Sequence, residues 1–323
     1  MGSWLRPAVI GLALVALLPR GAVAQDYPTR SVTILCPFAP GGGTDQISRA
    51  VALRLEQRLG KPFVVENRTG AGTLIAAAAA AKAAPDGYTL MQATSGTMSM
   101  NQTIFKNLSY EPLKDLVPVA LIAGVPFVLV VHPDLPVHSI ADLVKLAKER
   151  PLKYGSGGVS AFHHLNAELL SSMTGIKMTH IPNRGSVPAM TDLIQGSTDV
   201  LFVDIGPSIQ LIRAGKARAL GITSAEVAEA APEIPPLGKS LPGFDTTAWQ
   251  MMVAPGGTPR PVLEKLNTAI NAIVQGDDIK KQFVPTGIVP IGKGSLTELD
   301  AYVKSETTRW AAVIRNAGLA GSQ

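Results

Sequence analysis

Apolar and polar positions follow two alternating periods along most of the chain. Short apolar runs at 31–38 and 63–67 have the β-branched composition of buried strands, whereas 44–60 repeats its apolar residues at helical spacing and stops at a glycine. An alanine-rich helix at 76–84 and a strand at 86–94 complete a strand–helix–strand–helix–strand series. This order predicts a parallel sheet with helices on both faces.

The same alternation begins again after two long apolar runs, 116–124 and 125–133. Its strands are rich in Val, Ile and Leu, as sheets covered on both faces require. Strands are predicted at 152–156, 177–181, 198–204 and 217–224, and helices at 139–150, 161–175, 186–196 and 207–215. A proline-rich segment, 231–247, then precedes a strand at 248–255 and helices at 259–274 and 296–317.

This repetition predicts an α/β protein of two lobes, each a mostly parallel sheet flanked by helices. We expect one lobe to consist of 25–124 and 250–323, and the other of 125–249. The long apolar runs near 116–131 and 217–254 are the candidate crossings between the lobes.

The first 24 residues have the three-part layout of a secretory signal. Arg6 precedes an apolar stretch from Ala8 to Leu18, Pro19 breaks that stretch, and small residues end at Ala24. An uncleaved membrane anchor is the alternative, but the apolar stretch is shorter than the roughly 20 residues that span a bilayer. The pattern therefore predicts export, with cleavage near Ala24.

Charge and cysteine usage exclude some classes of protein. The formal net charge of +5 comes without a basic block, and aromatic residues make up 5% of the chain, so we expect no nucleic-acid partner. Cys36 is the single cysteine, so the chain has no internal disulfide and depends on its hydrophobic cores. Because Cys36 ends an apolar strand, we expect a buried structural thiol.

Three junctions share one design, in which a strand, a glycine-rich turn and a helix follow one another. They are FAPGGGTD at 38–45, NRTGAGT at 67–73 and YGSGGVSAFHH at 154–164. Glycine lets the backbone approach a ligand closely, and the unpaired N–H groups at the start of a helix point outward as donors to an anion. Open α/β sheets bind ligands at the carboxyl ends of their strands. The three junctions together therefore predict one anion site.

The predicted anion site suits a carboxylate better than a nucleotide. The Walker pattern needs Gly-Lys-Ser/Thr where Thr44 and Asp45 stand, and the second junction lacks the third glycine of a dinucleotide fingerprint. Asp45 would repel a phosphate, whereas backbone N–H groups and the Thr44 hydroxyl suit a carboxylate. No cofactor is expected. A second APGG, at 254–257, is interpreted as a turn without a ligand, because Pro259 removes a donor.

Other polar residues have competing interpretations. His164 and Glu168 share a helical face, but no third ligand is evident, so we expect no metal site. Asp204 ends a strand, and is either an exposed loop aspartate or a contact to a ligand ammonium or hydroxyl group. Asn183 follows the neighbouring strand at the corresponding position. Ser160 with a nearby histidine would suit a secreted hydrolase, although the G-x-S-x-G elbow is missing.

Longer segments of the chain match a known family pattern. They run from Tyr27 to about Pro259 and read YPTRSVTILCPFAPGGGTDQISR, GKPFVVENRTGAGT, APDGYTL, HHLNAELL, TDLIQGSTDVLF, PSIQLIRAGKARALGITS and MMVAPGGTP. With these segments the chain resembles the periplasmic solute-binding receptors of the tripartite tricarboxylate transporter family, the Bug receptors. The resemblance covers most of the mature chain.

The resemblance implies a two-lobed periplasmic-binding-protein fold (type II-like), with the ligand in a cleft between the lobes. It implies a receptor without enzymatic activity, which captures a small organic acid and delivers it to membrane permease subunits. A sensor kinase is the alternative partner. The ligand-binding residues expected from the junctions and the resemblance are Ala39, Pro40, Gly41, Gly42, Gly43, Thr44, Ala71, Gly72, Thr94, Ser95, Gly157, Gly158, Ser160, His163, His164, Asn183 and Asp204.

Two positions depart from the family pattern. In the turn usually written Asn-x-Pro-Gly-Ala-Gly-Gly, Thr69 and Thr73 replace the proline and the last glycine, and Thr73 is positioned to cap the next helix. Asn183 stands where tyrosine is frequent. The loss of an aromatic ring there would enlarge the cleft or make it more polar.

Overall fold

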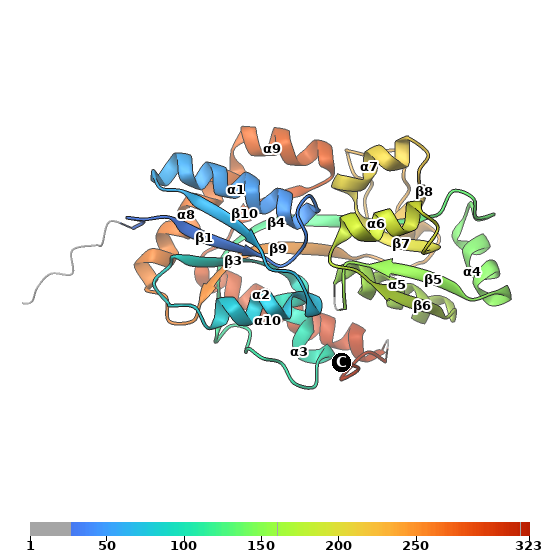
Figure 1. Cartoon of the computed structure of the whole chain (residues 1–323), viewed down its shortest axis with the longest axis horizontal. Coiled ribbons are helices and arrows are strands. Elements are labelled where there is room, and N and C mark those ends of the chain that lie inside the picture. The colour runs from blue at the N-terminus through green and yellow to red at the C-terminus, as the bar shows by residue number, and fades with distance from the viewer. Residues whose placement is uncertain (1–26, 160, 317) are drawn as a thin grey trace, which may run out of the picture.

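The computed structural model describes residues 27–159, 161–316 and 318–323, and consists of two lobes that share one mixed sheet (Figure 1). The predicted signal segment and Ser160 lie outside the described residues. The strands are β1 (Val32–Cys36), β2 (Phe63–Asn67), β3 (Thr89–Thr94), β4 (Leu116–Val131), β5 (Leu152–Ser156), β6 (Met178–Pro182), β7 (Val200–Asp204), β8 (Arg218–Ile222), β9 (Thr247–Pro255) and β10 (Val289–Lys293). The helices are α1 (Gly43–Leu59), α2 (Leu74–Ala81), α3 (Asn101–Ile104), α4 (Ile140–Glu149), α5 (Phe162–Thr174), α6 (Ser186–Ile194), α7 (Ile205–Arg213), α8 (Arg260–Gln275), α9 (Asp277–Phe283) and α10 (Leu296–Asn316).

Each lobe contains a strand–helix–strand–helix–strand unit with the same strand order. The order is β2-β1-β3 in one lobe and β6-β5-β7 in the other, and all four neighbouring pairs are parallel. Figure 1 shows α1 and α2 on opposite faces of the first sheet, and α6 and α5 on opposite faces of the second. The parallel arrangement predicted from the alternating pattern is confirmed for these strands. It arises because each helix returns the chain to the end of the sheet at which the preceding strand began.

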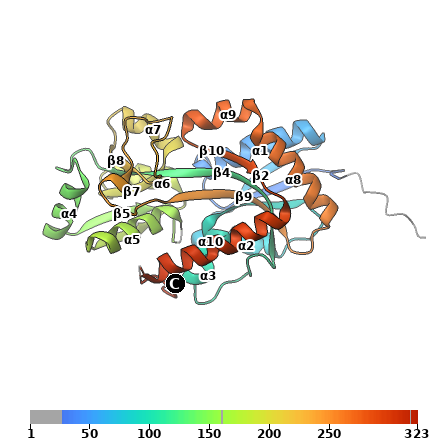
Figure 2. The same cartoon turned by 180° about the vertical axis from the view of Figure 1, so that it is seen from behind.

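The strands β4 and β9 run from one lobe into the other and join the two sheets (Figure 2). β4 pairs antiparallel with β9 over 116–126 and with β7 over 127–131. The two apolar runs predicted at 116–124 and 125–133 therefore form a single long strand. The lobe boundaries predicted at 124/125 and 249/250 fall within these two strands and stay a prediction.

Contacts between side chains also join the lobes. Trp310 on α10 packs edge-to-face against Phe162 at the start of α5, with the ring centroids 5.1 Å apart. Glu306 Oε2 accepts hydrogen bonds from the indole N–H groups of Trp310 at 3.0 Å and Trp249 at 2.9 Å. These bonds orient both indoles, so the C-terminal helix holds Trp310 against Phe162 of the other lobe. Cys36 is buried and free, as predicted.

Close packing requires glycine at Gly256 in the second APGG. A Cβ on Gly256 would clash with the carbonyl oxygen of Lys114, and the Gly256 N–H donates to the Asp115 carbonyl at 2.9 Å. The end of β9 thus lies directly against the turn that precedes β4. This close approach accounts for the glycine without a ligand.

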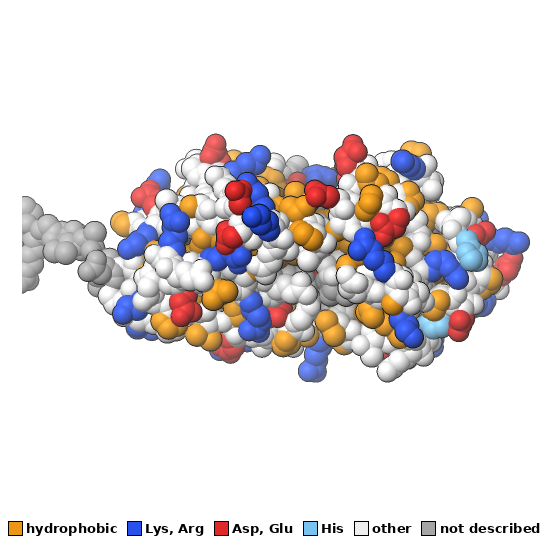
Figure 3. Space-filling model, turned by 90° about the horizontal axis from the view of Figure 1, so that it is seen from above, with side chains coloured by type: hydrophobic (Ala, Val, Ile, Leu, Met, Phe, Trp, Pro, Cys, Tyr) orange, Lys and Arg blue, Asp and Glu red, His pale blue; other side chains and the backbone are white. Residues whose placement is uncertain are grey.

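Charged side chains are mixed over the surface. Figure 3 shows lysines and arginines interspersed with acidic residues on one long face of the molecule, with small apolar areas between them. Within the described part of the chain, no helix combines the length and apolar character needed to cross a membrane.

Candidate ligand-binding site between the lobes

The turn between β1 and α1 is ordered by Asp45. Gly41 has a left-handed φ of +85°, which favours glycine, and its N–H donates to Asp45 Oδ2 at 2.9 Å. Asp45 also accepts hydrogen bonds from Arg49 Nε at 2.9 Å and Asn67 Nδ2 at 2.8 Å. Burial alone would raise the pKa of Asp45, but these donors lower it below its ordinary value. Asp45 is therefore a structural anion of the first junction.

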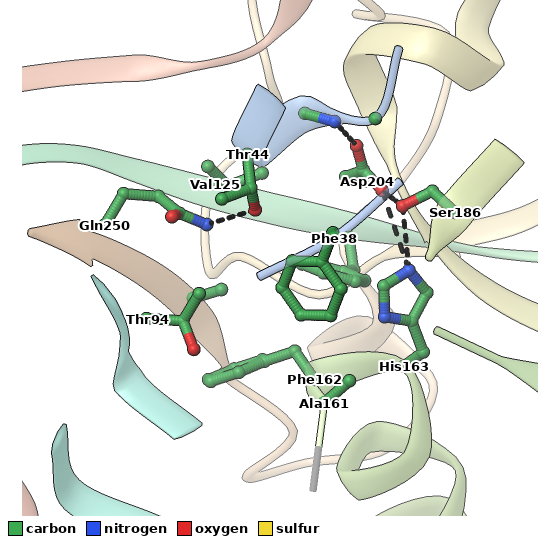
Figure 4. A pocket seen from close by; sticks show the side chains of 14 residues that line it. Phe38, Thr44, Thr94, Val125, Ala161, Phe162, His163, Ser186, Asp204 and Gln250 are labelled. Atoms are coloured by element: carbon green, nitrogen blue, oxygen red, sulfur yellow. Dashed lines mark hydrogen bonds and ion pairs between the residues drawn. The ribbon is translucent and has the colours of Figure 1, made fainter. Parts of the chain in front are cut away.

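The N-terminus of α1 bonds a carboxylate from the other lobe, that of Asp204. Asp204 ends β7, and its Oδ2 accepts the Gly43 N–H at 2.8 Å. Its Oδ1 accepts the hydroxyl hydrogen of Ser186, at the start of α6 (Figure 4). A Cβ on Gly43 would clash with Asp204 Oδ2, so the contact requires glycine at this position.

The hydrogen-bond order in this cluster follows from the number of available protons. Because Ser186 gives its single hydroxyl hydrogen to Asp204, its oxygen accepts from His163 Nε2, which lies 2.9 Å away. Among the residues that the structure describes, His163 Nδ1 is buried without a hydrogen-bond partner. The serine thus lies between the histidine and the aspartate, whereas in a hydrolytic triad the histidine lies between the other two. This order does not activate the serine as a nucleophile.

Asp204 is ionised in this setting. Burial alone would raise the pKa of its carboxyl group, but the contacts with His163, Ser186 and the Gly43 N–H lower it below its ordinary value. The positive end of the α1 dipole acts in the same direction. The cluster therefore places one buried negative charge at the boundary between the lobes.

A small cavity lies beside this cluster, between the lobes and the crossing strands (Figure 4). Its volume is about 30 Å³, room for one or two water molecules. It is lined by Phe38, Gly42, Gly43, Thr44, Thr94, Val125, Phe127, Ala161, Phe162, His163, Ser186, Asp204, Ala248 and Gln250. We call it the inner cavity. An organic acid can enter it only if the lobes move apart.

The inner cavity has an apolar wall and two different polar ends. Phe38 and Phe162 contribute aromatic rings to the wall (Figure 4), and Phe127 also lines it. On the first lobe, Gln250 Nε2 donates to Thr44 Oγ1 at 3.1 Å, close to the start of α1. On the second lobe, the polar end is the Asp204 cluster. Among the lining residues, none is a lysine or an arginine.

A second hollow of about 410 Å³, the outer cleft, lies on the other side of Phe38. It is lined by Pro37, Phe38, Thr69, Gly70, Ala71, Gly72, Thr73, Ile75, Gly157, Gly158, Val159, Pro182, Asn183 and Arg184. A Cβ on Gly158 would lie 3.8 Å from Gly72 Cα, so the second and third glycine junctions face each other here. The Ala39 N–H donates to the Arg184 carbonyl at 3.0 Å and joins the lobes at its edge.

The residues predicted for one site therefore divide between two hollows. Gly42, Gly43, Thr44, Thr94, His163 and Asp204 line the inner cavity, and Ala71, Gly72, Gly157, Gly158 and Asn183 line the outer cleft. The lining of these two hollows does not include Ala39, Pro40, Gly41, Ser95 or His164. A role for each of these residues in ligand binding stays a prediction.

Two of the predicted residues have partners within their own lobe. Asn183 Nδ2 donates to Asp192 Oδ2 at 2.9 Å, which fixes its amide at the edge of the outer cleft. His164 lines neither hollow, and its ring stacks on that of His180 with centroids 4.4 Å apart. Glu168 Oε1 lies 4.0 Å from His164 Nε2, on the helical face predicted from their spacing.

The His164 cluster is buried in the second lobe. Burial lowers the pKa of both His164 and His180 to about 4, so both rings are neutral near pH 7. Ser156 Oγ lies 2.6 Å from His180 Nε2 and also accepts the Gly158 N–H at 3.0 Å. The cluster thus supports the third glycine junction from behind. The described residues contain no group of three or more His, Cys, Asp or Glu arranged to bind a metal ion.

Sequence reasoning missed several residues that line the inner cavity. Phe38 and Phe162 lie within the first and third glycine junctions, but nothing in the surrounding sequence distinguished them from aromatic residues of the core. Ser186 begins a helix and Gln250 lies in the middle of an apolar strand. A polar residue in such a strand was the available signal for Gln250, because a buried amide needs a partner.

Comparisons with known proteins agree with this architecture. Residues 47–319 match the model of the TctC family, described as the tripartite tricarboxylate transporter family receptor. Protein BugT of Bordetella pertussis (strain Tohama I) is 34% identical over 316 residues, which cover 96% of this chain and 97% of BugT.

Solved structures of similar sequence share this fold. "R. palustris Rpa4515 with adipate" has a TM-score of 0.87 at 36% identity and covers 91% of this chain and 99% of its own. "MatC (Rpa3494) from Rhodopseudomonas palustris with bound malate" has a TM-score of 0.84 at 30% identity and covers 89% of this chain and 100% of its own. The relatives are solute-binding proteins, and this chain is likewise a binding protein and not an enzyme. With a family match over most of its length and relatives of this similarity, the chain belongs to the TctC family of tripartite tricarboxylate transporter receptors.

Proposed function

We propose that the protein is a periplasmic receptor that binds a small carboxylate between its lobes and delivers it to the membrane subunits of a tripartite tricarboxylate transporter. One observation carries the proposal. The Gly43 N–H, at the start of α1, bonds a carboxylate at 2.8 Å, and that carboxylate belongs to the facing lobe. The same helix end, with the Thr44 hydroxyl beside it, is suited to a ligand carboxylate when the lobes are apart.

The similar proteins support the ligand class. The Rhodopseudomonas palustris structures contain adipate and malate, both small carboxylates. Charge-assisted hydrogen bonds contribute about 1.5–3 kcal/mol each. After the costs of association, several such bonds give micromolar affinity, about −8 kcal/mol. Periplasmic location is supported by BugD, a similar protein whose structure is that of a periplasmic binding protein.

Closure of the lobes would couple binding to delivery. The lobes meet through the bonds Ala39–Arg184 and Gly43–Asp204, and through the rings of Phe162 and Trp310. These contacts must separate for an acid to enter the inner cavity and can re-form over a bound ligand. A membrane partner would then recognise the closed arrangement. A sensor kinase is the second candidate partner, and uptake of labelled ligand by cells that contain the permease but lack the kinase would distinguish the two.

The test is thermal melting of the mature chain, residues 25–323, with a panel of carboxylates at one pH. The panel includes aspartate, glutamate, citrate, succinate, adipate, nicotinate, benzoate and terephthalate. A ligand at about one hundred times its dissociation constant adds roughly 2.7 kcal/mol of stability, which raises the melting temperature by several degrees. The absence of a shift for the whole panel, in protein shown by mass spectrometry to carry no bound acid, would contradict the proposal.

Gly42→Asp connects the shift to the site. A Cβ at Gly42 makes only ordinary contacts, 3.7 Å from the Ala39 carbonyl and 3.8 Å from Ser186 Oγ, so a side chain fits. The added carboxylate would occupy the inner cavity and repel an acid, and we expect the melting shift to disappear. Gly42→Ala is the matched control, which adds the Cβ without the charge and should keep the shift. An equal shift in Gly42→Asp and Gly42→Ala would place the ligand elsewhere.

A further inference from the structure

The outer cleft has the size of a ligand site, and the inner cavity does not. Its volume is about 410 Å³, within the range of small-molecule sites, whereas the inner cavity has about 30 Å³. Both lobes line it, the first with 69–73 and the second with 157–159 and 182–184. The outer cleft therefore has room for the part of an organic acid that the inner cavity does not hold.

The wall that the first lobe contributes to the outer cleft is a strained turn. All residues of 70–73 have positive φ, and Ala71 at 46° and Thr73 at 81° are not glycine. A β-branched residue rarely adopts this conformation. The Thr73 hydroxyl forms no cap to α2, and instead accepts hydrogen bonds from Thr97 Oγ1 at 3.1 Å and Asn101 Nδ2 at 3.3 Å. Strained residues that are fixed in this way by their surroundings are concentrated at ligand sites.

Arg184 is the one charged residue among the described residues that line the outer cleft. It is exposed, and none of the described residues pairs with its guanidinium, whereas Arg68 of the second glycine junction is paired with Glu66 at 2.7 Å. Asp192 holds the Asn183 amide at 2.9 Å but does not line the cleft. Since arginine binds a carboxylate through two parallel hydrogen bonds, an acidic group in the cleft would meet a suitable partner that is not already paired.

The outer cleft is within reach of the inner cavity. Phe38 lines both hollows, and a Cβ on Gly185 would lie 3.6 Å from Phe38 Cβ. On either side of Gly185, Arg184 lines the outer cleft and Ser186 lines the inner cavity. Because two residues span at most about 7 Å, a single small acid can extend from one hollow into the other.

We infer that the outer cleft is the subsite for the far end of the ligand and that Arg184 binds a second acidic group there, so the receptor selects dicarboxylates long enough to pass Phe38. This inference rests on the proposed function and narrows its ligand class. The first carboxylate would lie at the start of α1, beside Thr44. One ligand would then contact both groups of residues that the sequence placed in a single site.

The experiment compares acids of equal length that differ in the second carboxylate. The pairs are butanoate and succinate, hexanoate and adipate, octanoate and suberate, and benzoate and terephthalate. Titration calorimetry measures their dissociation constants with the wild-type mature chain and with Arg184→Gln, which removes the charge from an exposed position. Arg184→Lys keeps the charge. Arg260→Gln is the matched control, because the Arg260 side chain begins α8 and is 72% exposed.

In at least one of the three longer pairs, we expect the dicarboxylate to bind the wild type about five-fold or more tightly than its monocarboxylate, the upper range for an exposed ion pair. Arg184→Gln should bring that ratio close to one, Arg184→Lys should keep part of it, and Arg260→Gln should leave it unchanged. Succinate is too short to reach the outer cleft from the start of α1, so its affinity should be the same in the wild type and in Arg184→Gln.

Two results would overturn the inference while the proposed function stands. A wild-type ratio of one or less in all three longer pairs would show that the site does not bind a second acidic group. A preference for the dicarboxylate that survives in Arg184→Gln would show that a group other than Arg184 binds the far carboxylate. If none of these acids and none of the melting panel binds, the proposed function fails, and the inference fails with it.

Discussion

The contact between Gly43 and Asp204 can be tested by adding one methyl group. In Gly43→Ala the new Cβ would clash with Asp204 Oδ2, so the Asp204 carboxylate must move and its hydrogen bond of 2.8 Å to the backbone N–H is lost or weakened. The backbone of Gly43 needs no left-handed conformation, because its φ lies outside the range that side chains avoid. The substitution therefore changes the contact and not the turn.

The size of the effect follows from two opposing contributions. A hydrogen bond to a charged group contributes about 1.5–3 kcal/mol, and the Asp204 carboxylate is too buried to replace it with water. Replacement of glycine by alanine in a compatible backbone stabilises by about 0.4–1 kcal/mol. We expect Gly43→Ala to lower the free energy of unfolding by about 1–2 kcal/mol.

Urea unfolding of four proteins measures this contribution: the wild type, Gly43→Ala, Asp204→Ala and the double variant. In the Asp204→Ala background the obstructing oxygen is absent, and the nearest remaining atom, Cβ of residue 204, lies at an ordinary 3.6 Å. There, Gly43→Ala should be neutral or slightly stabilising, so the coupling energy of the cycle should be about 1.5–3 kcal/mol. An equal cost of Gly43→Ala in both backgrounds would refute the reasoning.

Two further predictions concern buried titratable groups. Burial lowers the pKa of His164 and His180 from 6.5 to about 4, so between these values the unfolded chain binds more protons than the folded one. The free energy of unfolding should therefore decrease as the pH falls from 6.5 to 4, with a shallower slope in His180→Gln; parallel urea profiles for the two proteins would contradict this. Burial raises the pKa of the Cys36 thiol to about 11, so Cys36 is protonated and unreactive near pH 7. Cys36→Ser should leave ligand affinity unchanged by calorimetry, and a ten-fold loss would contradict a structural role.

Local sequence patterns predicted the order of the elements and the edge of the sheet where the hollows lie. The glycine junctions after β1 and β2 lie together because these parallel strands end at a common edge. The junction after β5 faces them because the parallel strands of the second lobe run in the opposite direction, so that the carboxyl ends of both units meet between the lobes. The prediction of a structural, buried Cys36 followed from its place at the end of an apolar strand and is confirmed. The two apolar runs at 116–124 and 125–133 form one strand instead, and Gly124 lies within β4, where a Cβ would be 3.2 Å from the side chain of Thr247.

Relations between distant residues were harder to predict. The partner of Asp204 is Gly43, 161 residues earlier, and nothing in the strand that ends at Asp204 indicates that its carboxylate reaches the start of α1. The expected site divides into two hollows, and Phe38 is the one residue that lines both. Side-chain directions of this kind are set by packing in three dimensions and leave no periodic signal in the sequence.

The pairing of β4 with β9 has a consequence for how the chain is divided. The ladder between them ends at Pro126 and Thr247, which are direct partners. The chain leaves the first lobe after 126 and returns to it at 247. The second lobe is thus an insertion whose two ends are neighbours. Joining 126 to 247 by a short turn would convert β4 and β9 into a hairpin, so the first lobe would keep its strand pairs, and the second lobe would keep those of 127–131 with β7 and β8.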